Sequence, residues 1–165
     1  MERKMIIGIM GPGESAAESD LEVAFQLGKK LAEENFLVLT GGRSQGVMDA
    51  AMKGAKSAGG TTIGILPSAD GNDQSKFVDI PIKTGMGSAR NNINVLTSDL
   101  VVAVGMGAGT ASEVTLAIKA NKPVILMNAS PETMPFLEQF AHPELVKANT
   151  IEEALQNINR FLSDS

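Results

Sequence analysis

The sequence predicts an α/β fold, a doubly wound and mostly parallel sheet with helices on both faces. Three observations predict it. Five short apolar runs are continuous rather than alternating, which is typical of strands that are covered by helices on both faces. Segments with helical spacing separate these runs, as expected for strands joined by right-handed crossovers. The chain has 165 residues, 43% of them hydrophobic, which is enough for one packed domain over residues 1–165.

The expected strands are continuous apolar runs of four to six residues. In chain order they are Met5–Met10, Phe36–Leu39, Thr62–Leu66, Leu100–Val104 and Val124–Met127. A polar, turn-rich segment, Ala69–Lys76, predicts a surface excursion before another short run at Phe77–Ile82.

The expected helices lie between and after these runs, at Leu21–Glu34, Val47–Ser57, Arg90–Leu96, Ala111–Ala120 and Ile151–Leu162. In the third helix the spacing predicts a buried stripe of Ala89, Ile93 and Leu96. Arg90, Asn94 and Thr97 are then expected to point away from that stripe. A second helix face, formed by Met48, Ala50, Ala51, Met52 and Ala55, either covers the sheet or packs against another copy of the chain.

Four Ser/Thr…Glu pairs at capping-box spacing indicate helix starts, because each side chain can bond a free backbone N–H group of the other residue. They are Ser15…Glu18, Ser19…Glu22, Thr110…Glu113 and Thr150…Glu153. The first two compete for one helix start. The third gives Glu113 a structural role as an alternative to a chemical one.

Composition excludes several function classes. A formal net charge of −5 excludes a protein that binds nucleic acid through a generally basic surface. The absence of Cys excludes disulfides, Cys-ligated zinc and thiol nucleophiles, and the single His142 excludes multi-histidine metal sites. The apolar runs are too short to span a membrane, and the N-terminal residues make a poor signal peptide. We therefore expect a cytoplasmic protein without nucleic-acid, membrane or metal partners.

Three of the expected strands end in glycine-rich turns, namely Gly11–Ser15, Thr40–Gly46 and Gly105–Thr110. Glycine lets backbone N–H groups approach an anion, and a helix N-terminus adds free N–H groups and partial positive charge. Because ligands of doubly wound sheets bind where strands end beside the switch in strand order, we expect a phosphate here. The candidate ligand-binding residues are Gly11, Gly13, Gly41, Gly42, Arg43, Gly46, Gly105, Gly107, Gly109, Thr110 and Ser112. The alternative is that the glycines only form tight turns.

Two familiar phosphate cradles are excluded. No Gly-Lys-Ser/Thr occurs, so there is no P-loop. The first loop, Gly8-Ile9-Met10-Gly11-Pro12-Gly13, has the wrong spacing for a dinucleotide fingerprint, and the second strand ends in Thr40 rather than an acid. Arg90 lies in another glycine-containing turn, where a guanidinium suits a phosphate or carboxylate, although it can equally be a solvated surface arginine.

Four stretches of the chain resemble motifs of the Lonely Guy (LOG) superfamily of Rossmann-like proteins. They are Gly41–Asp49, Gly64-Ile65-Leu66-Pro67, Gly87–Asn91 and Gly105–Glu113. The patterns Gly-Gly-Arg-x-x-Gly-Val-Met and Ala-Arg-Asn are similar to the branch that includes the molybdenum-cofactor carrier proteins, which bind a pterin phosphate. In LOG enzymes, the residues that match Arg90 and Glu113 are the catalytic pair that cleaves a nucleoside 5′-monophosphate into free base and ribose 5-phosphate.

The resemblance implies a homodimer or a higher homo-oligomer, and it leaves the function open among three alternatives. The first is a binder of a phosphorylated heterocycle, a nucleotide or the molybdenum cofactor as cargo. The second is a phosphoribohydrolase in which Glu113 stabilises an oxocarbenium-like state and Arg90 positions the phosphate. The third is an interaction module without a small ligand.

Overall fold

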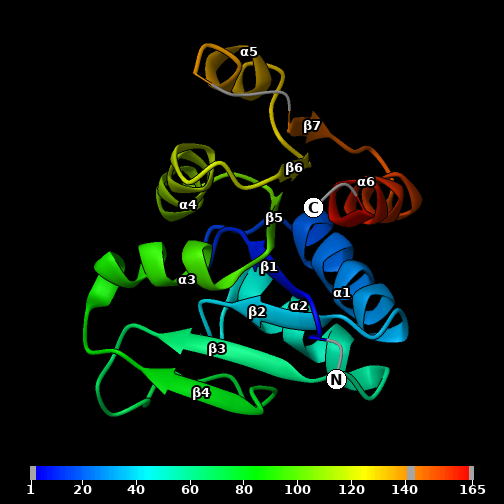
Figure 1. The fold of residues 1–165 in the computed structure, drawn as a ribbon. Coiled ribbons are helices and arrows are strands. Elements are labelled where there is room, and N and C mark those ends of the chain that lie inside the picture. The colour runs from blue at the N-terminus through cyan, green and yellow to red at the C-terminus, as the bar shows by residue number, and fades with distance from the viewer. Residues whose placement is uncertain (1–2, 141–143, 164–165) are drawn as a thin grey trace.

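The computed structural model describes residues 3–140 and 144–163, and at its centre these residues form a seven-stranded sheet (Figure 1). The strands are β1 (Ile6–Met10), β2 (Leu37–Thr40), β3 (Thr62–Leu66), β4 (Ile80–Lys83), β5 (Leu100–Val104), β6 (Val124–Met127) and β7 (Leu145–Lys147). Their order is β4-β3-β2-β1-β5-β6-β7, and every neighbouring pair is parallel. The predicted fold class is confirmed, and the five expected strands agree with the observed ones to within one residue at each end.

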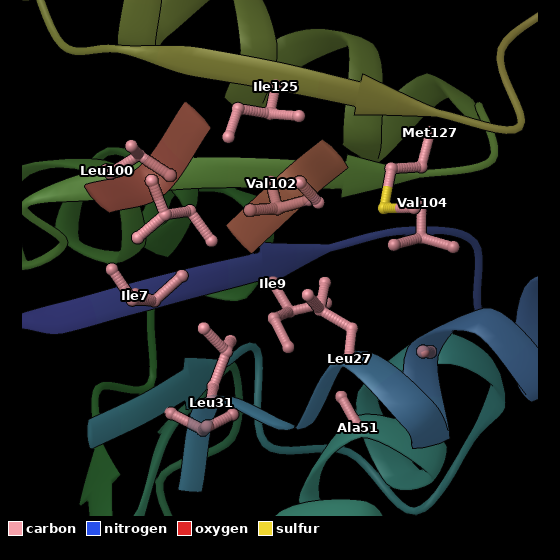
Figure 2. Packing of buried hydrophobic residues seen from close by; sticks show 14 of the residues in the cluster. Ile7, Ile9, Leu27, Leu31, Ala51, Leu100, Val102, Val104, Ile125 and Met127 are labelled. Carbon is pink, nitrogen blue, oxygen red and sulfur yellow. The ribbon is translucent and has the colours of Figure 1, made fainter. Parts of the chain in front are cut away.

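Helices cover both faces of the sheet (Figure 1). They are α1 (Glu18–Glu33), α2 (Gly46–Ser57), α3 (Asn91–Thr97), α4 (Ala108–Lys119), α5 (Thr133–Leu137) and α6 (Ile151–Ser163), with a 3₁₀ turn, η1 (Gly87–Arg90), before α3. One apolar layer lies between the sheet and α1, α2 and α6, and a second lies between the sheet and α3, α4 and α5. Figure 2 shows the first layer, in which side chains of β1, β5 and β6 meet Leu27, Leu31 and Ala51 of α1 and α2.

Three elements were not predicted, namely the 3₁₀ turn η1, the helix α5 and the edge strand β7. They have four, five and three residues, and all three residues of β7 are partly or fully exposed. Segments this short carry too few buried positions to show a period. His142 lies outside the described residues.

The predicted start of α1 is wrong. The helix begins at Glu18, and the Asp20 carboxylate in its first turn accepts the Ala17 N–H at 3.2 Å and the Asn128 side-chain amide at 3.0 Å. Neither Ser15 nor Ser19 caps it. At α6 the prediction is confirmed in part, because Thr150 Oγ1 accepts the Glu153 N–H at 3.1 Å but Glu153 bonds the N–H of Asn149.

The predicted orientation of α3 is wrong in part. Arg90 and Asn94 are buried, and of the predicted stripe Ile93 packs against the core whereas Ala89 and Leu96 are exposed. Arg90 and Asn94 are buried because their side chains bond oxygens of other segments, which a count of apolar residues does not reveal.

The α2 face that carries Ala51, Met52 and Ala55 is fully buried within the chain, so of the two alternatives it covers the core. None of the helices in the described part of the chain has the length and apolarity needed to span a membrane.

The helices α1 and α2 pack with their backbones in close approach. A Cβ at Gly54 of α2 would overlap the carbonyl oxygen of Phe25 in α1, and a Cβ at Gly28 would overlap that of Ala51. The absence of a Cβ at these two positions therefore sets the distance between α1 and α2, and with it the position of the loop that precedes α2.

We predict that Gly54→Ala destabilises the protein by about 1–3 kcal/mol, because overpacking exceeds the gain of about 1 kcal/mol in helix propensity. Urea unfolding measures the change. Lys53→Ala, at an exposed position of the same helix, is the control and should change stability by less than about 0.5 kcal/mol. A Gly54→Ala protein as stable as the wild type would contradict the close approach.

Candidate anion-binding site

A cleft of about 240 Å³ lies at the carboxyl edge of the sheet, where the strand order switches between β1 and β5. The loops after β1, β2 and β5 form it together with η1 and the first turns of α4. Its lining residues are Gly11, Pro12, Gly13, Ser15, Arg43, Met48, Ser88, Arg90, Asn91, Gly107, Ala108, Gly109, Thr110 and Glu113.

The N-terminus of α4 opens into this cleft. The helix begins at Ala108 after an extended Gly107, so the amides of residues 108–110 have no acceptor within the helix. The first turn contains no acidic residue. The Thr110 hydroxyl is buried, with the residue only 2% exposed, and it has no hydrogen-bond partner. Free amides, an unpaired hydroxyl and the positive end of the helix dipole together suit an oxyanion.

The other two helices that follow glycine-rich turns have protein groups placed at their N-termini. At α2 the Val47 N–H donates to the Pro12 carbonyl at 3.0 Å. Gly46, with a φ of +55°, packs so closely on the Gly13 carbonyl that a Cβ would overlap it. At α1 the Asp20 carboxylate lies in the first turn and accepts the N–H of Ala17, the residue before the helix. The three glycine-rich strand ends are therefore not equivalent, because α1 and α2 carry acidic residues in their first turns and α4 carries none.

The structure brings eight of the predicted site residues to the cleft and leaves five outside its lining. Those that line it are Gly11, Gly13, Arg43, Arg90, Gly107, Gly109, Thr110 and Glu113. Those outside are Gly41, Gly42, Gly46, Gly105 and Ser112. The Ser112 hydroxyl is already used, since it accepts from Asn91 at 2.7 Å and donates to the Gly109 carbonyl at 2.8 Å.

Sequence reasoning missed six lining residues, namely Pro12, Ser15, Met48, Ser88, Asn91 and Ala108. Pro12, Ser15 and Ala108 lie within the predicted loops, and Asn91 follows Arg90. Met48 and Ser88 lie two residues from a predicted site residue, inside the stretches Gly41–Asp49 and Gly87–Asn91 that resemble family motifs. Those loops and stretches were the available signal.

Arg90 is buried rather than a solvated surface arginine. Its guanidinium donates to the carbonyls of Ile65 at 2.7 Å and Gly41 at 3.2 Å, and more weakly to Gly87 at 3.4 Å and Asn91 Oδ1 at 3.3 Å. Burial lowers the pKa of Arg90, but a guanidinium stays charged at any physiological pH. Arg90 thus ties β3, the end of β2 and η1 together behind the cleft.

Glu113 does not form the predicted capping box with Thr110. The N-cap of α4 is Gly107, which places Thr110 inside the helix, and the Glu113 carboxyl instead accepts the Asn94 side-chain amide of α3 at 2.8 Å. Burial raises the pKa of Glu113 to about 7, against the opposing effects of the Asn94 hydrogen bond and the Arg90 charge.

Arg43 stands at the solvent side of the cleft. Its Nε donates to the Asp73 carboxylate at 3.1 Å, and both side chains are about one-third exposed. Met106 lines a separate apolar pocket beside α5 and does not cover the α4 amides.

Comparisons with known proteins identify the family. The model of the SLOG cluster4 family matches residues 4–155. The chain belongs to this family. The match confirms the predicted resemblance to the LOG-like superfamily.

Two solved structures and one further relative are similar to the chain over most of its length. The molybdenum cofactor binding protein of Rippkaea orientalis is 49% identical, with a TM-score of 0.96 over 98% of this chain and 99% of the other. The molybdenum cofactor carrier protein of Chlamydomonas reinhardtii is 51% identical, with a TM-score of 0.93 over the same shares. A protein of Archaeoglobus fulgidus is 41% identical over 142 residues, 85% of this chain and 90% of its own length.

We predict that Glu113→Gln removes a pH dependence of stability. In the wild type, the unfolded chain loses this proton near its usual pKa of 4.5, whereas the folded protein keeps it up to about 7. The free energy of unfolding should therefore fall by about 3 kcal/mol more in the wild type than in the variant between pH 4.5 and pH 8. Urea unfolding at several pH values measures this, and parallel stability curves would contradict it.

Proposed function

We propose that this chain binds a phosphorylated heterocyclic ligand of the molybdenum-cofactor type and carries it as cargo, with the phosphate at the N-terminus of α4. The observation that carries the proposal is the buried, unpartnered Thr110 hydroxyl beside the free amides of that helix. A protein tolerates such an orphan donor at a cost of about 1–3 kcal/mol, and an oxyanion would satisfy it.

Gly109 supports the same position for the phosphate. A Cβ at Gly109 would meet no protein atom within 4 Å, so packing does not require glycine there. Glycine in a helix costs about 1 kcal/mol relative to alanine. Close approach of a ligand to the backbone accounts for glycine at this position.

Two cations complete the proposed site in different ways. Arg43 has guanidinium N–H groups beyond the one that bonds Asp73, and it lies at the open side of the cleft, where it can bond a second polar group of the ligand. Arg90 donates its hydrogen bonds to carbonyl oxygens, so it contributes positive charge and holds the wall of the cleft in place. Proteins of known structure that are 49% and 51% identical over 98% of the chain are described as binding or carrying the molybdenum cofactor.

A phosphoribohydrolase is the second candidate, because Glu113 and Arg90 line the same cleft as the α4 amides. Incubation with a panel of nucleoside 5′-monophosphates separates the two. Release of free base that is lost in Glu113→Gln would establish the enzyme. No release, together with thermal stabilisation by the molybdenum cofactor, would establish the carrier. If the protein shows neither base release nor thermal stabilisation, the interaction module is favoured. The homodimer and the cytoplasmic location stay predictions.

We predict that Thr110→Val weakens binding of the molybdenum cofactor about 10- to 100-fold, through loss of a hydrogen bond to a charged group. Equilibrium titration measures the change. The apo-protein should be at least as stable as the wild type, since the methyl group replaces an unpaired buried hydroxyl.

Thr115→Val is the matched control for this experiment. Thr115 is an exposed residue of the same helix, outside the cleft lining, and its hydroxyl bonds the Ala111 carbonyl at 2.9 Å. It should bind as the wild type does. Equal binding by Thr110→Val and the wild type would contradict a phosphate at α4.

A further inference from the structure

Glu113 and Asn94 form a buried pair between α4 and α3 that the proposed function does not explain. Glu113 is 7% exposed and Asn94 is fully buried. The Asn94 Nδ2 donates to Glu113 Oε1 at 2.8 Å. The pair stands at the wall of the cleft, because Glu113 is one of its lining residues.

The hydrogen bonds of this pair are incomplete if Glu113 is ionised. The Asn94 Oδ1 is buried and has no donor. An ionised carboxylate only accepts hydrogen bonds, so it cannot supply that donor, whereas a protonated carboxyl carries one O–H group. A protonated Glu113 adds a donor beside an amide that lacks one, and it avoids a charge that burial penalises.

The charged groups around Glu113 do not fully compensate the free-energy cost of ionising this buried carboxyl. Arg90, at the end of η1, is the cation that acts on Glu113 directly, and its donors are bonded to other oxygens. No salt bridge within 4.0 Å joins Arg90 and Glu113 in the described chain. Arg43 and Asp73, from the loops beyond β2 and β3, act on Arg90 with opposite signs. Asn91 and Asn94 of α3 are neutral.

We propose that Glu113 is a proton-operated gate of the anion site: as a neutral acid it admits an oxyanion to the α4 N-terminus, and as a carboxylate it weakens that anion's binding. This inference rests on the proposed function, because it needs an anion in the same cleft. The burial that raises the pKa of Glu113 to about 7 puts the switch near neutral pH. Two negative groups in one cleft repel each other, so a bound anion also holds the proton on Glu113 more tightly.

Sulfate is the probe of choice, because it keeps its double negative charge between pH 6 and pH 8.5. We expect the affinity of the wild type for sulfate, measured by calorimetric titration, to fall at least about tenfold over this range. In Glu113→Gln, which cannot ionise, the change should be less than about twofold. Glu14→Gln removes an exposed carboxylate, bonded to Gln45 near the mouth of the cleft, and should keep the pH dependence of the wild type.

Carbon-13 NMR of the Glu113 carboxyl reports its protonation in the wild type without any variant or ligand. A midpoint near 7 supports the gate, and a midpoint near the usual 4.5 overturns it. Sulfate binding with the same pH dependence in the wild type and Glu113→Gln overturns the gate alone. No sulfate binding at any pH overturns the gate and the proposed phosphate site together.

Discussion

The free N–H groups at the start of α4 are the constraint on which the site depends. A helix cannot satisfy its own first amides, so each must find an acceptor elsewhere. Around this cleft, acidic side chains lie in the first turns of α1 and α2, and the Val47 amide of α2 bonds the Pro12 carbonyl. The first turn of α4 has no acidic residue, and the Thr110 hydroxyl there is unpaired. The fold therefore leaves a cluster of donors at the start of α4, where it lines the cleft.

The wall around these donors is held by buried polar groups rather than by apolar packing. Arg90 bonds carbonyl oxygens of β3, of η1 and of Gly41 just after β2, which ties the strand ends to the turn that precedes α3. Asn91 and Asn94 continue this contact from α3 to α4 through Ser112 and Glu113. The same network that fixes the cleft's shape places one ionisable carboxyl in it, so the charge of the site can depend on pH.

Much of the fold could be predicted because β1, β2, β3, β5 and β6 are buried on both faces. Successive side chains of these strands enter the two apolar layers in turn, so each strand is a continuous apolar run between turn residues. The short elements α5 and β7 could not be predicted, because most of their residues are at least partly exposed. The face of α3 was mispredicted because the carbonyl partners of Arg90 are Ile65 of β3 and Gly41 just after β2, which lie 25 and 49 residues away.

The site was predictable as a region but not in its details. Glycine-rich strand ends mark three loops, and a sequence gives no means of ranking them. The ranking depends on which amides are already bonded, and such bonds are set by tertiary contacts like that between Pro12 and Val47 of α2. The capping box expected at Thr110 and Glu113 failed for the same reason, because Asn94 of another helix takes the carboxyl.

Backbone NMR during titration with inorganic phosphate at pH 6 tests the central claim most directly. If the α4 N-terminus is the anion site, the amide signals of residues 108–110 shift together and saturate, while those at the start of α1 and α2 stay in place. Saturable shifts centred on Val47 or Ala17, with none at residues 108–110, would contradict it.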